Sequence, residues 1–218
     1  MAPTTRTSRA LRHPKRPDEI LEAACRAILE RGFADTRVAD IAQAAGTSTG
    51  TIHYYFDSRE EVLGAALHWA TERLFARLET PADTPALVRL ARLLELSIPY
   101  SRPKARRDEY VLWIEMWTLV LHDPERLGAL EDLSLRWRSF FFDAIEAGAA
   151  SGEFRPIADP EVVAERLIAL VDGLGFETVV GYSWTSARRM RALLLDFACE
   201  QLQLDRGELD RLMQVRNL

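Results

Sequence analysis

Residues 46–62, GTSTGTIHYYFDSREEV, decide how this sequence is interpreted, because a start rich in hydroxyl groups leads into four consecutive ring residues. Neighbouring residues of a helix point in different directions, so four consecutive rings cannot all face one core. Ile52 and Phe56 lie four residues apart and share one helical face, which predicts that they are the core anchors. We therefore expect an exposed position for the three rings between them: His53, Tyr54 and Tyr55.

The residues before this stretch predict two helices. Residues 18–31 place apolar side chains at helical spacing, and Gly32 ends that helix. We expect Thr36 to cap a second helix, which ends at Gly46. Its apolar face consists of four residues: Val38, Ile41, Ala42 and Ala45.

The stretch itself predicts a third helix and the start of a fourth. A short helix fits residues 48–55, and Ser58–Glu61 has the pattern of a capping box that opens a helix reaching about Leu78. The second and third helices, separated by Gly46–Ser48, form a predicted helix-turn-helix. In such a unit the second helix lies in the DNA major groove, and its first residues meet base edges and phosphates. A generic helical pair has the same spacing, so spacing alone leaves DNA binding open.

The side chains at the start of the third helix favour DNA binding. Short hydroxyl groups, phenols and imidazoles hydrogen bond to bases or phosphates, and a glycine lets the backbone approach the DNA. Arg59 begins the next helix, where the helix dipole and a cation together favour a phosphate. The alternative is that the rings form a core or interface cluster. We expect DNA contacts from nine residues: Arg37, Ser48, Thr49, Gly50, Thr51, His53, Tyr54, Tyr55 and Arg59.

The charge of the chain is unevenly distributed. Residues 1–59 carry nine Lys or Arg against seven Asp or Glu, whereas the remainder carries 19 against 26, and the net charge is −5. This balance argues against a protein that coats nucleic acid with its whole surface. Residues 1–16 hold five basic side chains and no acid, which fits a flexible basic arm on DNA phosphates. A solvated, disordered tail is the alternative.

The chain beyond Pro81 keeps helical periodicity and has no sustained strand alternation, so we predict an all-α protein. No apolar run is long enough to span a membrane, and no secretory signal is recognisable, so we expect a cytoplasmic protein. Cys25 and Cys199 are expected to be buried and reduced. A basic loop is expected at residues 100–108, and helices are expected at residues 86–98, 109–122, 125–150, 160–181, 187–203 and 205–215.

Residues 17–67 resemble the N-terminal domain of the TetR family of one-component transcription regulators. The register is carried by Arg31-Gly32-Phe33, the Thr36 cap, Ala45-Gly46, the run from Gly50 to Phe56, and Ser58-Arg59-Glu60. Two positions depart from the family pattern, because His53 is usually Tyr and Thr49 is Lys or Arg in many members. We therefore expect fewer charged contacts from this helix, and a phosphate contact of His53 that weakens as the pH rises.

Later segments are similar to the C-terminal domain of BetI-type members of this family. The resemblance implies a helix-turn-helix DNA-binding domain at residues 17–63 and a ligand-binding and dimerisation domain at residues 64–218. It implies a homodimer with its interface on the helices at 160–181 and 187–203. It also implies a repressor that a small molecule releases from a palindromic DNA operator, with a transcriptional activator of the same fold as the alternative. The similar features are Trp113, Trp117, Asp123-Pro124, Trp137, Gly152-Glu153-Phe154, Asp159-Pro160 and Asp172-Gly173-Leu174.

Aromatic residues at helical spacing predict a ligand pocket in this second part, although such rings more often form an ordinary core. Three acids lie in apolar helical stretches: Glu115, Asp172 and Glu177. Acids beside rings suit an amine or another cation through charge pairing and cation–π contact. The candidate ligand-binding residues are Tyr110, Trp113, Trp117, Trp137, Phe141, Asp172 and Phe176.

Catalytic motifs are not recognisable in the sequence. None of the four histidines has the spacing of a metal site, and there is no G-x-S-x-G elbow, P-loop or GxGxxG pattern. We therefore expect no enzymatic activity, no metal site and no cofactor. A helical protein-interaction module that does not touch DNA is the remaining alternative.

Overall fold

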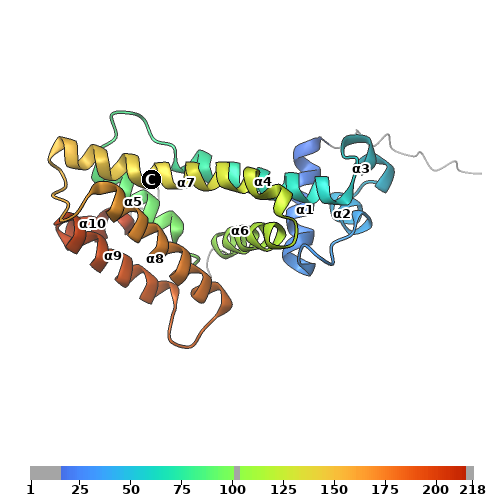
Figure 1. The fold of residues 1–218 in the computed structure, drawn as a ribbon. Coiled ribbons are helices and arrows are strands. Elements are labelled where there is room, and N and C mark those ends of the chain that lie inside the picture. The colour runs from blue at the N-terminus through green and yellow to red at the C-terminus, as the bar shows by residue number, and fades with distance from the viewer. Residues whose placement is uncertain (1–15, 101–103, 215–218) are drawn as a thin grey trace, which may run out of the picture. The chain divides into compact units, whose positions relative to one another are not determined.

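The computed structural model describes residues 16–100 and 104–214 of the chain (Figure 1). These residues form helices and no strand, so the predicted all-α class is confirmed. The chain divides into two compact units, Met1–Ala66 and Leu67–Leu218. The predicted domain boundary, between residues 63 and 64, lies three residues before this division. The predicted basic arm lies outside the described residues apart from Arg16.

The first unit consists of three short helices and the start of a longer one. α1 packs against α2, and α2 packs against α3. Their contact faces are rich in alanine and isoleucine, which lets short helices approach closely around a small core. The helices are α1 (Pro17–Arg31), α2 (Val38–Ala45), α3 (Thr49–Tyr55) and α4 (Arg59–Leu78), the last of which continues into the second unit.

The turn of the helix-turn-helix begins at Gly46. Gly46 has a left-handed backbone with φ 64°, and the N–H of Thr47 donates to the carbonyl of Ala42 at 2.9 Å. This pattern ends α2 as a glycine C-cap does, because glycine enters the left-handed region without steric penalty. The predicted end of the second helix is therefore confirmed.

The prediction that Thr36 caps α2 is wrong. Thr36 is fully buried, and its hydroxyl donates to the carbonyls of Gly32 at 2.7 Å and Ala27 at 3.3 Å. The N-cap is Arg37, whose backbone N–H donates to the carboxylate of Asp40 at 2.9 Å. Thr36 therefore ties the loop back onto the end of α1, a role that its sequence position does not distinguish from capping.

The predicted capping box at the start of α4 is present in a modified form. Ser58 Oγ accepts from the N–H of Glu61 at 3.0 Å, as expected. The carboxylate of Glu61 accepts at 2.6 Å from the N–H of Asp57, one residue before the N-cap. Both bonds satisfy backbone donors at the helix start, which would otherwise lack partners.

The second unit is a bundle in which α7 packs against α5 and α8, and α8 packs against α9 (Figure 1). α10 packs against α5 and α9. None of the described helices combines the length and the apolar character needed to cross a membrane. The elements are α5 (Ala86–Ser97), α6 (Ala105–His122), a 3-10 turn η1 (Pro124–Arg126), α7 (Leu127–Ser151), α8 (Pro160–Val180), α9 (Ala187–Leu202) and α10 (Arg206–Gln214).

The expected basic loop at residues 100–108 is only partly correct, because α6 already begins at Ala105. Arginine is a good helix former, so positive charge alone is no reason to end a helix. Lys104 and Asp108 also form an i,i+4 ion pair at 2.9 Å across this first turn. The earlier start brings Arg106 onto the helix, four residues before Tyr110.

The Gly152-Glu153-Phe154 motif joins α7 to α5. Gly152 ends α7 in the left-handed region with φ 80°, and the Glu153 carboxylate accepts from the first two N–H groups of α5 at 3.2 and 3.1 Å. Phe154 is buried directly on Gly148, where an added Cβ would lie 2.2 Å from the ring. The motif thus closes this end of the second unit.

Both cysteines are free, as predicted from their isolation in the sequence. Cys25 is buried in the first unit, and burial raises the pKa of its thiol to about 12. Cys199 is half-buried on α9, and burial is also the main cause that raises its pKa.

Candidate DNA-binding and effector sites

The ring residues of α3 divide between core and surface as the helical spacing predicts. Ile52 is fully buried and Phe56 is buried at the helix end. His53 is exposed, and Tyr54 is 80 % exposed. Tyr55 is half-buried and contacts Tyr54 edge to face, with ring centroids 4.9 Å apart. The two phenols therefore form a paired surface beside the exposed face of α3.

The hydroxyl groups at the start of α3 cap the helix and also form part of its exposed surface. Ser48 is the N-cap, and its Oγ accepts from the N–H of Thr51 at 3.1 Å. The hydroxyls of Ser48 and Thr51 are also 3.0 Å apart and hydrogen bonded. Thr49 is exposed and follows directly. A hydroxyl has one donor and two acceptor sites, so Ser48 keeps capacity for a further partner.

Gly50 is exposed, and the fold does not require a glycine there. A Cβ added at Gly50 would lie 3.7 Å from Ser48 Oγ, which is an ordinary van der Waals contact. The backbone conformation at Gly50 is also helical. The missing side chain is therefore free to serve another purpose, such as close approach of a ligand to the backbone.

The side chain of Arg59 is directed into the protein. Its guanidinium donates to the carbonyls of Thr36 at 2.5 Å and Ala34 at 2.8 Å, and also to the carbonyl of Phe33. It lies 5.4 Å from the centroid of the Phe33 ring and pairs with Glu60 at 3.0 Å. These contacts hold the loop between α1 and α2, and they use most of the five N–H donors of the group. No sequence signal points to this role, because the loop carbonyls become neighbours of Arg59 only on folding.

Arg37 is the cation left on the surface at the start of α2. It is exposed, and among the described residues its guanidinium forms no ion pair. Arg31, by contrast, lies 3.4 Å from the carboxylate of Asp40. In its described residues the first unit thus combines an exposed arginine at the start of α2, a hydroxyl-rich helix start and exposed rings, which are groups that contact phosphates and base edges.

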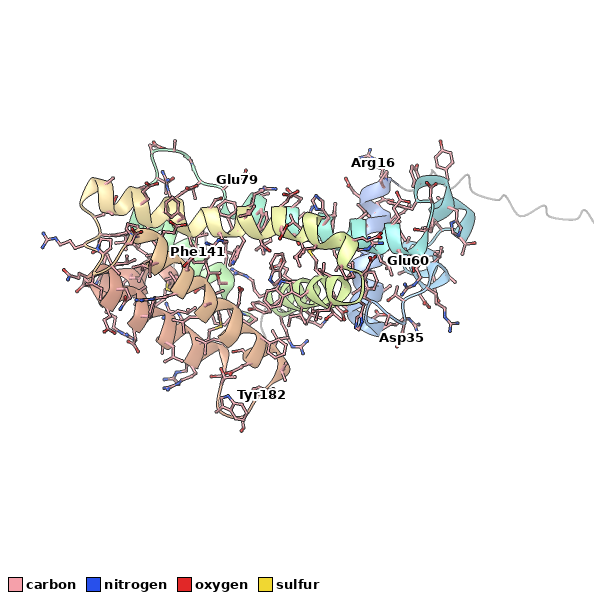
Figure 2. All side chains as sticks on the ribbon, viewed as in Figure 1. Arg16, Asp35, Glu60, Glu79, Phe141 and Tyr182 are labelled. Carbon is pink, nitrogen blue, oxygen red and sulfur yellow. The ribbon has the colours of Figure 1, made fainter. Side chains whose placement is uncertain are left out.

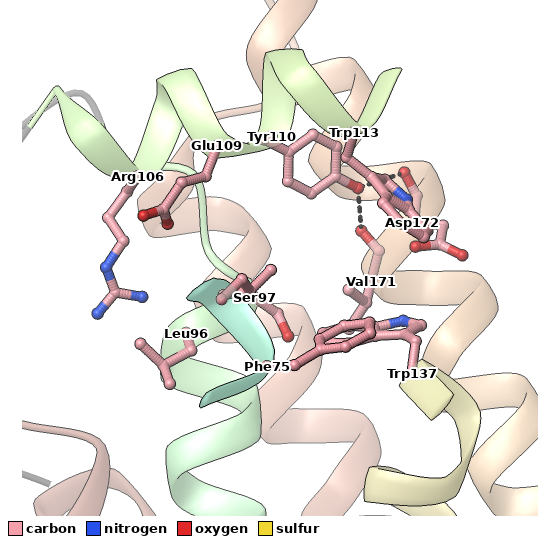
Figure 3. A pocket seen from close by; sticks show the side chains of 11 residues that line it. Phe75, Leu96, Ser97, Arg106, Glu109, Tyr110, Trp113, Trp137, Val171 and Asp172 are labelled. Atoms are coloured by element: carbon pink, nitrogen blue, oxygen red, sulfur yellow. Dashed lines mark hydrogen bonds between the residues drawn. The ribbon is translucent and has the colours of Figure 1, made fainter. Parts of the chain in front are cut away.

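A cavity of about 40 Å³ lies within the second unit, between α4, α5, α6, α7 and α8 (Figure 3). In this state it has room for a few water molecules. Tyr110 and Trp113 lie on one side, and Trp137 lies across from them. The lining residues are Leu74, Phe75, Leu96, Ser97, Arg106, Glu109, Tyr110, Trp113, Trp137, Val171 and Asp172.

Four of the seven predicted ligand residues line this cavity, namely Tyr110, Trp113, Trp137 and Asp172. The other three do not. Trp117 lies one turn further along α6 and packs against Trp113, with centroids 6.0 Å apart. Phe141 is fully buried inside the unit (Figure 2) and contacts Trp137 at 5.0 Å. Phe176 is 39 % exposed on α8.

The cavity also takes residues that the sequence did not single out. Phe75 on α4 stacks on Trp137, with centroids 6.5 Å apart, and belongs to a helix that was assigned no ligand role. Arg106 lies within the loop expected at residues 100–108, and Glu109 is the first residue of the helix expected after it. Since Arg106 precedes Tyr110 by four residues, an earlier start for α6 would have placed both on one face.

Asp172 is the acidic side chain of the cavity that lacks a partner. Among the described residues none donates a hydrogen bond to its carboxylate or pairs with it. Burial raises its pKa from 3.8 to about 6. Glu109, in contrast, pairs with Arg77 at 2.7 Å. The two other acids considered from the sequence, Glu115 and Glu177, do not line the cavity.

Tyr110 fixes the distance between α6 and α8. Its hydroxyl donates to the carbonyls of Val171 at 3.1 Å and Asp172 at 2.9 Å. This approach depends on Gly175, because a Cβ there would lie 2.2 Å from the Tyr110 oxygen. Burial raises the pKa of the phenol, so it remains a hydrogen-bond donor at neutral pH.

Comparison with known families matches both units. Residues 20–66 match the family described as bacterial regulatory proteins, tetR family. Residues 86–203 match the family described as BetI-type transcriptional repressor, C-terminal. The second match alone spans more than half of the chain.

Similar proteins align with most of the chain. The regulator KstR2 of Mycobacterium tuberculosis is 31 % identical over 68 % of this chain and 74 % of its own. BetI of Cronobacter sakazakii is 28 % identical over 87 % of this chain and 92 % of its own. A Saccharomonospora viridis protein described as a transcriptional regulator, crystallised with choline, is 37 % identical, with a TM-score of 0.73 over 85 % of this chain and 96 % of its own. On the two family matches and these relatives, the chain belongs to the TetR family of DNA-binding, ligand-responsive transcriptional regulators, with a BetI-type C-terminal domain.

Proposed function

We propose that this protein is a repressor that binds a two-fold symmetric operator as a homodimer and is released by a small organic cation. The observation that carries the effector class is the unpaired carboxylate of Asp172 beside the rings of Tyr110, Trp113 and Trp137. Negative charge next to aromatic faces attracts a cation through charge pairing and cation–π contact. A neutral ligand would cover this half-buried carboxylate without compensating its charge.

The first unit supports the DNA-binding half of the proposal. The exposed start of α3 enters the major groove, with Thr49 and Gly50 near base edges and His53, Tyr54 and Tyr55 on the sugar-phosphate backbone. Arg37, together with the predicted basic arm, supplies charge toward phosphates.

A homodimer follows from the geometry of such operators. Two recognition helices must reach half-sites about 34–36 Å apart, which a single helix-turn-helix cannot do. Exposed apolar side chains on α8 and the loop after it support an interface there, as expected from the family. They are Phe176, Val180, Tyr182 and Trp184.

The size of the cavity indicates how the effector acts. At about 40 Å³ it is far smaller than the roughly 300 Å³ or more of an occupied ligand site, so an organic cation enters only when lining side chains or helices move apart. The effector then stabilises a widened state of the second unit. The effector can lower the affinity for DNA only by the ratio of its own affinities for the widened state and the DNA-binding state.

The test compares choline with 3,3-dimethylbutan-1-ol, its neutral isostere, by calorimetry and by release of DNA from upstream of the protein's own gene. We expect choline to bind and release the DNA, and the isostere to do neither. Asp172→Asn should abolish the response to choline. Glu161→Gln, which changes an exposed acid at the start of the same helix, is the matched control and should retain it.

Asp172→Asn also separates a binding role from a structural one. Removing a half-buried charge that has no partner among the described residues should raise the melting temperature, whereas loss of a structural ion pair would lower it. Equal binding of choline and its isostere, or a choline response that survives in Asp172→Asn, would contradict the proposed effector class.

A further inference from the structure

The cavity wall contains a second polar group without a partner. Trp137 is 9 % exposed, and its indole Nε1 is buried with no hydrogen-bond partner among the described residues. A buried tryptophan N–H ordinarily finds an acceptor, because an unpaired donor carries the full penalty of its lost hydration. The Trp137 N–H therefore lacks an acceptor within the described part of the chain, and a bound ligand could supply one.

The indole ring is held in place by its neighbours. The Phe75 ring lies nearly parallel to it, at 12° and a centroid distance of 6.5 Å, and Phe141 contacts it edge to face at 5.0 Å. With both contacts fixed, the ring cannot turn its N–H to another partner without losing packing. Trp137 thus presents a fixed donor across the cavity from Tyr110 and Trp113 (Figure 3).

Four other polar side chains of the lining already have partners within the fold. The Ser97 hydroxyl donates to the carbonyl of Leu93 at 2.6 Å, and Arg106 donates to the carbonyl of Glu95 at 3.1 Å. Glu109 is paired with Arg77, and the Tyr110 hydroxyl is bonded to α8. The Asp172 carboxylate and the buried Trp137 N–H, neither of which has a partner among the described residues, therefore remain available to select a ligand.

We propose that Trp137 is a specificity-determining residue, and that the effector is an organic cation that also carries a hydrogen-bond acceptor, such as an alcohol oxygen. This inference rests on the proposed function and deepens it. Asp172 and the rings select the positive charge, and Trp137 Nε1 donates to the acceptor. A tetraalkylammonium ion without an acceptor satisfies the first requirement and leaves the indole N–H unpaired.

The test uses choline and propyltrimethylammonium, in which a methyl group replaces the hydroxyl. Calorimetry on the full-length protein should give a preference for choline of roughly 2- to 12-fold, the range expected for one net hydrogen bond. Trp137→Phe keeps an aromatic ring and removes the donor, so it should bind both cations with equal affinity. The matched control Trp113→Phe should weaken both cations and keep the preference for choline.

A second measurement does not depend on how well the variant folds. In the wild-type protein labelled with nitrogen-15, the indole N–H resonance of Trp137 should shift downfield with choline and much less with propyltrimethylammonium. If both cations bind equally to the wild type, or if Trp137→Phe folds and keeps the preference, the inference is overturned and the cationic effector stands. If neither cation binds, the proposed effector class is wrong and the inference falls with it.

Discussion

The candidate DNA-binding residues of α3 are consecutive positions on one short helix, whereas the cavity takes 11 side chains from five helices. In α3 the helical repeat alone separates the buried Ile52 and Phe56 from the exposed Tyr54. In the cavity, the helical repeat of α6 correctly places Tyr110 and Trp113 but says nothing of Phe75 on α4. The residues of a site on one helix can be predicted from the helical repeat, whereas the residues of a site between helices depend on how the helices pack.

The largest effect is expected from Gly175→Ala in the cavity. The added Cβ overlaps the Tyr110 ring, so Tyr110 must leave the backbone of α8. Overpacking of this kind costs about 1–3 kcal/mol and should abolish effector binding. Gly173→Ala, two residues earlier and open around its Cβ, is the control and should be neutral or stabilising by up to about 1 kcal/mol. Thermal unfolding measures the stability of both variants, and calorimetry measures their effector affinity. Equal stability and equal affinity of the two variants would show that the contact with Tyr110 does not position α8.

On the helix, Tyr55→Ala should weaken operator binding by about tenfold, which corresponds to about 1.4 kcal/mol. The oligomeric state and effector affinity should not change. Fluorescence anisotropy with labelled operator at physiological salt gives the affinity. Tyr55→Phe divides the effect between hydroxyl and ring, because only the hydroxyl bonds a phosphate. Unchanged affinity in Tyr55→Ala would remove this residue from the DNA surface.

Acid should affect the cavity through Asp172. With its pKa raised to about 6, the carboxyl is increasingly protonated below that pH, so cation affinity should fall by about tenfold from pH 7 to about pH 5. Stability responds in the opposite direction: the folded protein binds more protons than the unfolded chain between 3.8 and about 6, so this group adds stability as the pH falls through that window. Calorimetry at several pH values, with Asp172→Asn as the control that lacks this group, checks both signs.

The smallest effect is expected from Gly50→Ala, which tests whether α3 uses its glycine for DNA rather than for folding. The Cβ fits, so stability should stay within about 1 kcal/mol, whereas operator binding should weaken several-fold because the backbone is held away from DNA. Gly46→Ala is the counterpart: its φ of 64° makes alanine unfavourable by about 1 kcal/mol or more. Melting temperatures and operator affinities together distinguish the two glycines, and a stability loss in Gly50→Ala would assign it a folding role.

Two residues have contacts in the structure that were not expected from the sequence. Thr36 and Arg59 have the local features of a helix cap and a phosphate ligand, yet Thr36 hydrogen bonds to the end of α1 and Arg59 to the carbonyls of the loop between α1 and α2. The acceptors of Arg59 lie 23 and 25 residues away along the chain and become its neighbours only on folding, whereas Thr36 donates backward to α1 instead of forward to α2. Conversely, the C-cap at Gly46 and the Ser58 cap are confirmed, because their partners lie within five residues along the chain.

The sequence by itself determined the all-α class, most helix boundaries, the helix-turn-helix and the exposed rings of α3, since these depend on spacing, caps and the helical repeat. Only the tertiary structure decided that Arg59 serves the loop and that Trp117, Phe141 and Phe176 lie outside the cavity. It also decided that Asp172 and Trp137 Nε1 have no partner within residues 16–100 and 104–214. Whether a polar group finds a hydrogen-bond or ion-pair partner depends on the distances between helices. Those distances are set by close packing, such as that of the Tyr110 ring on Gly175.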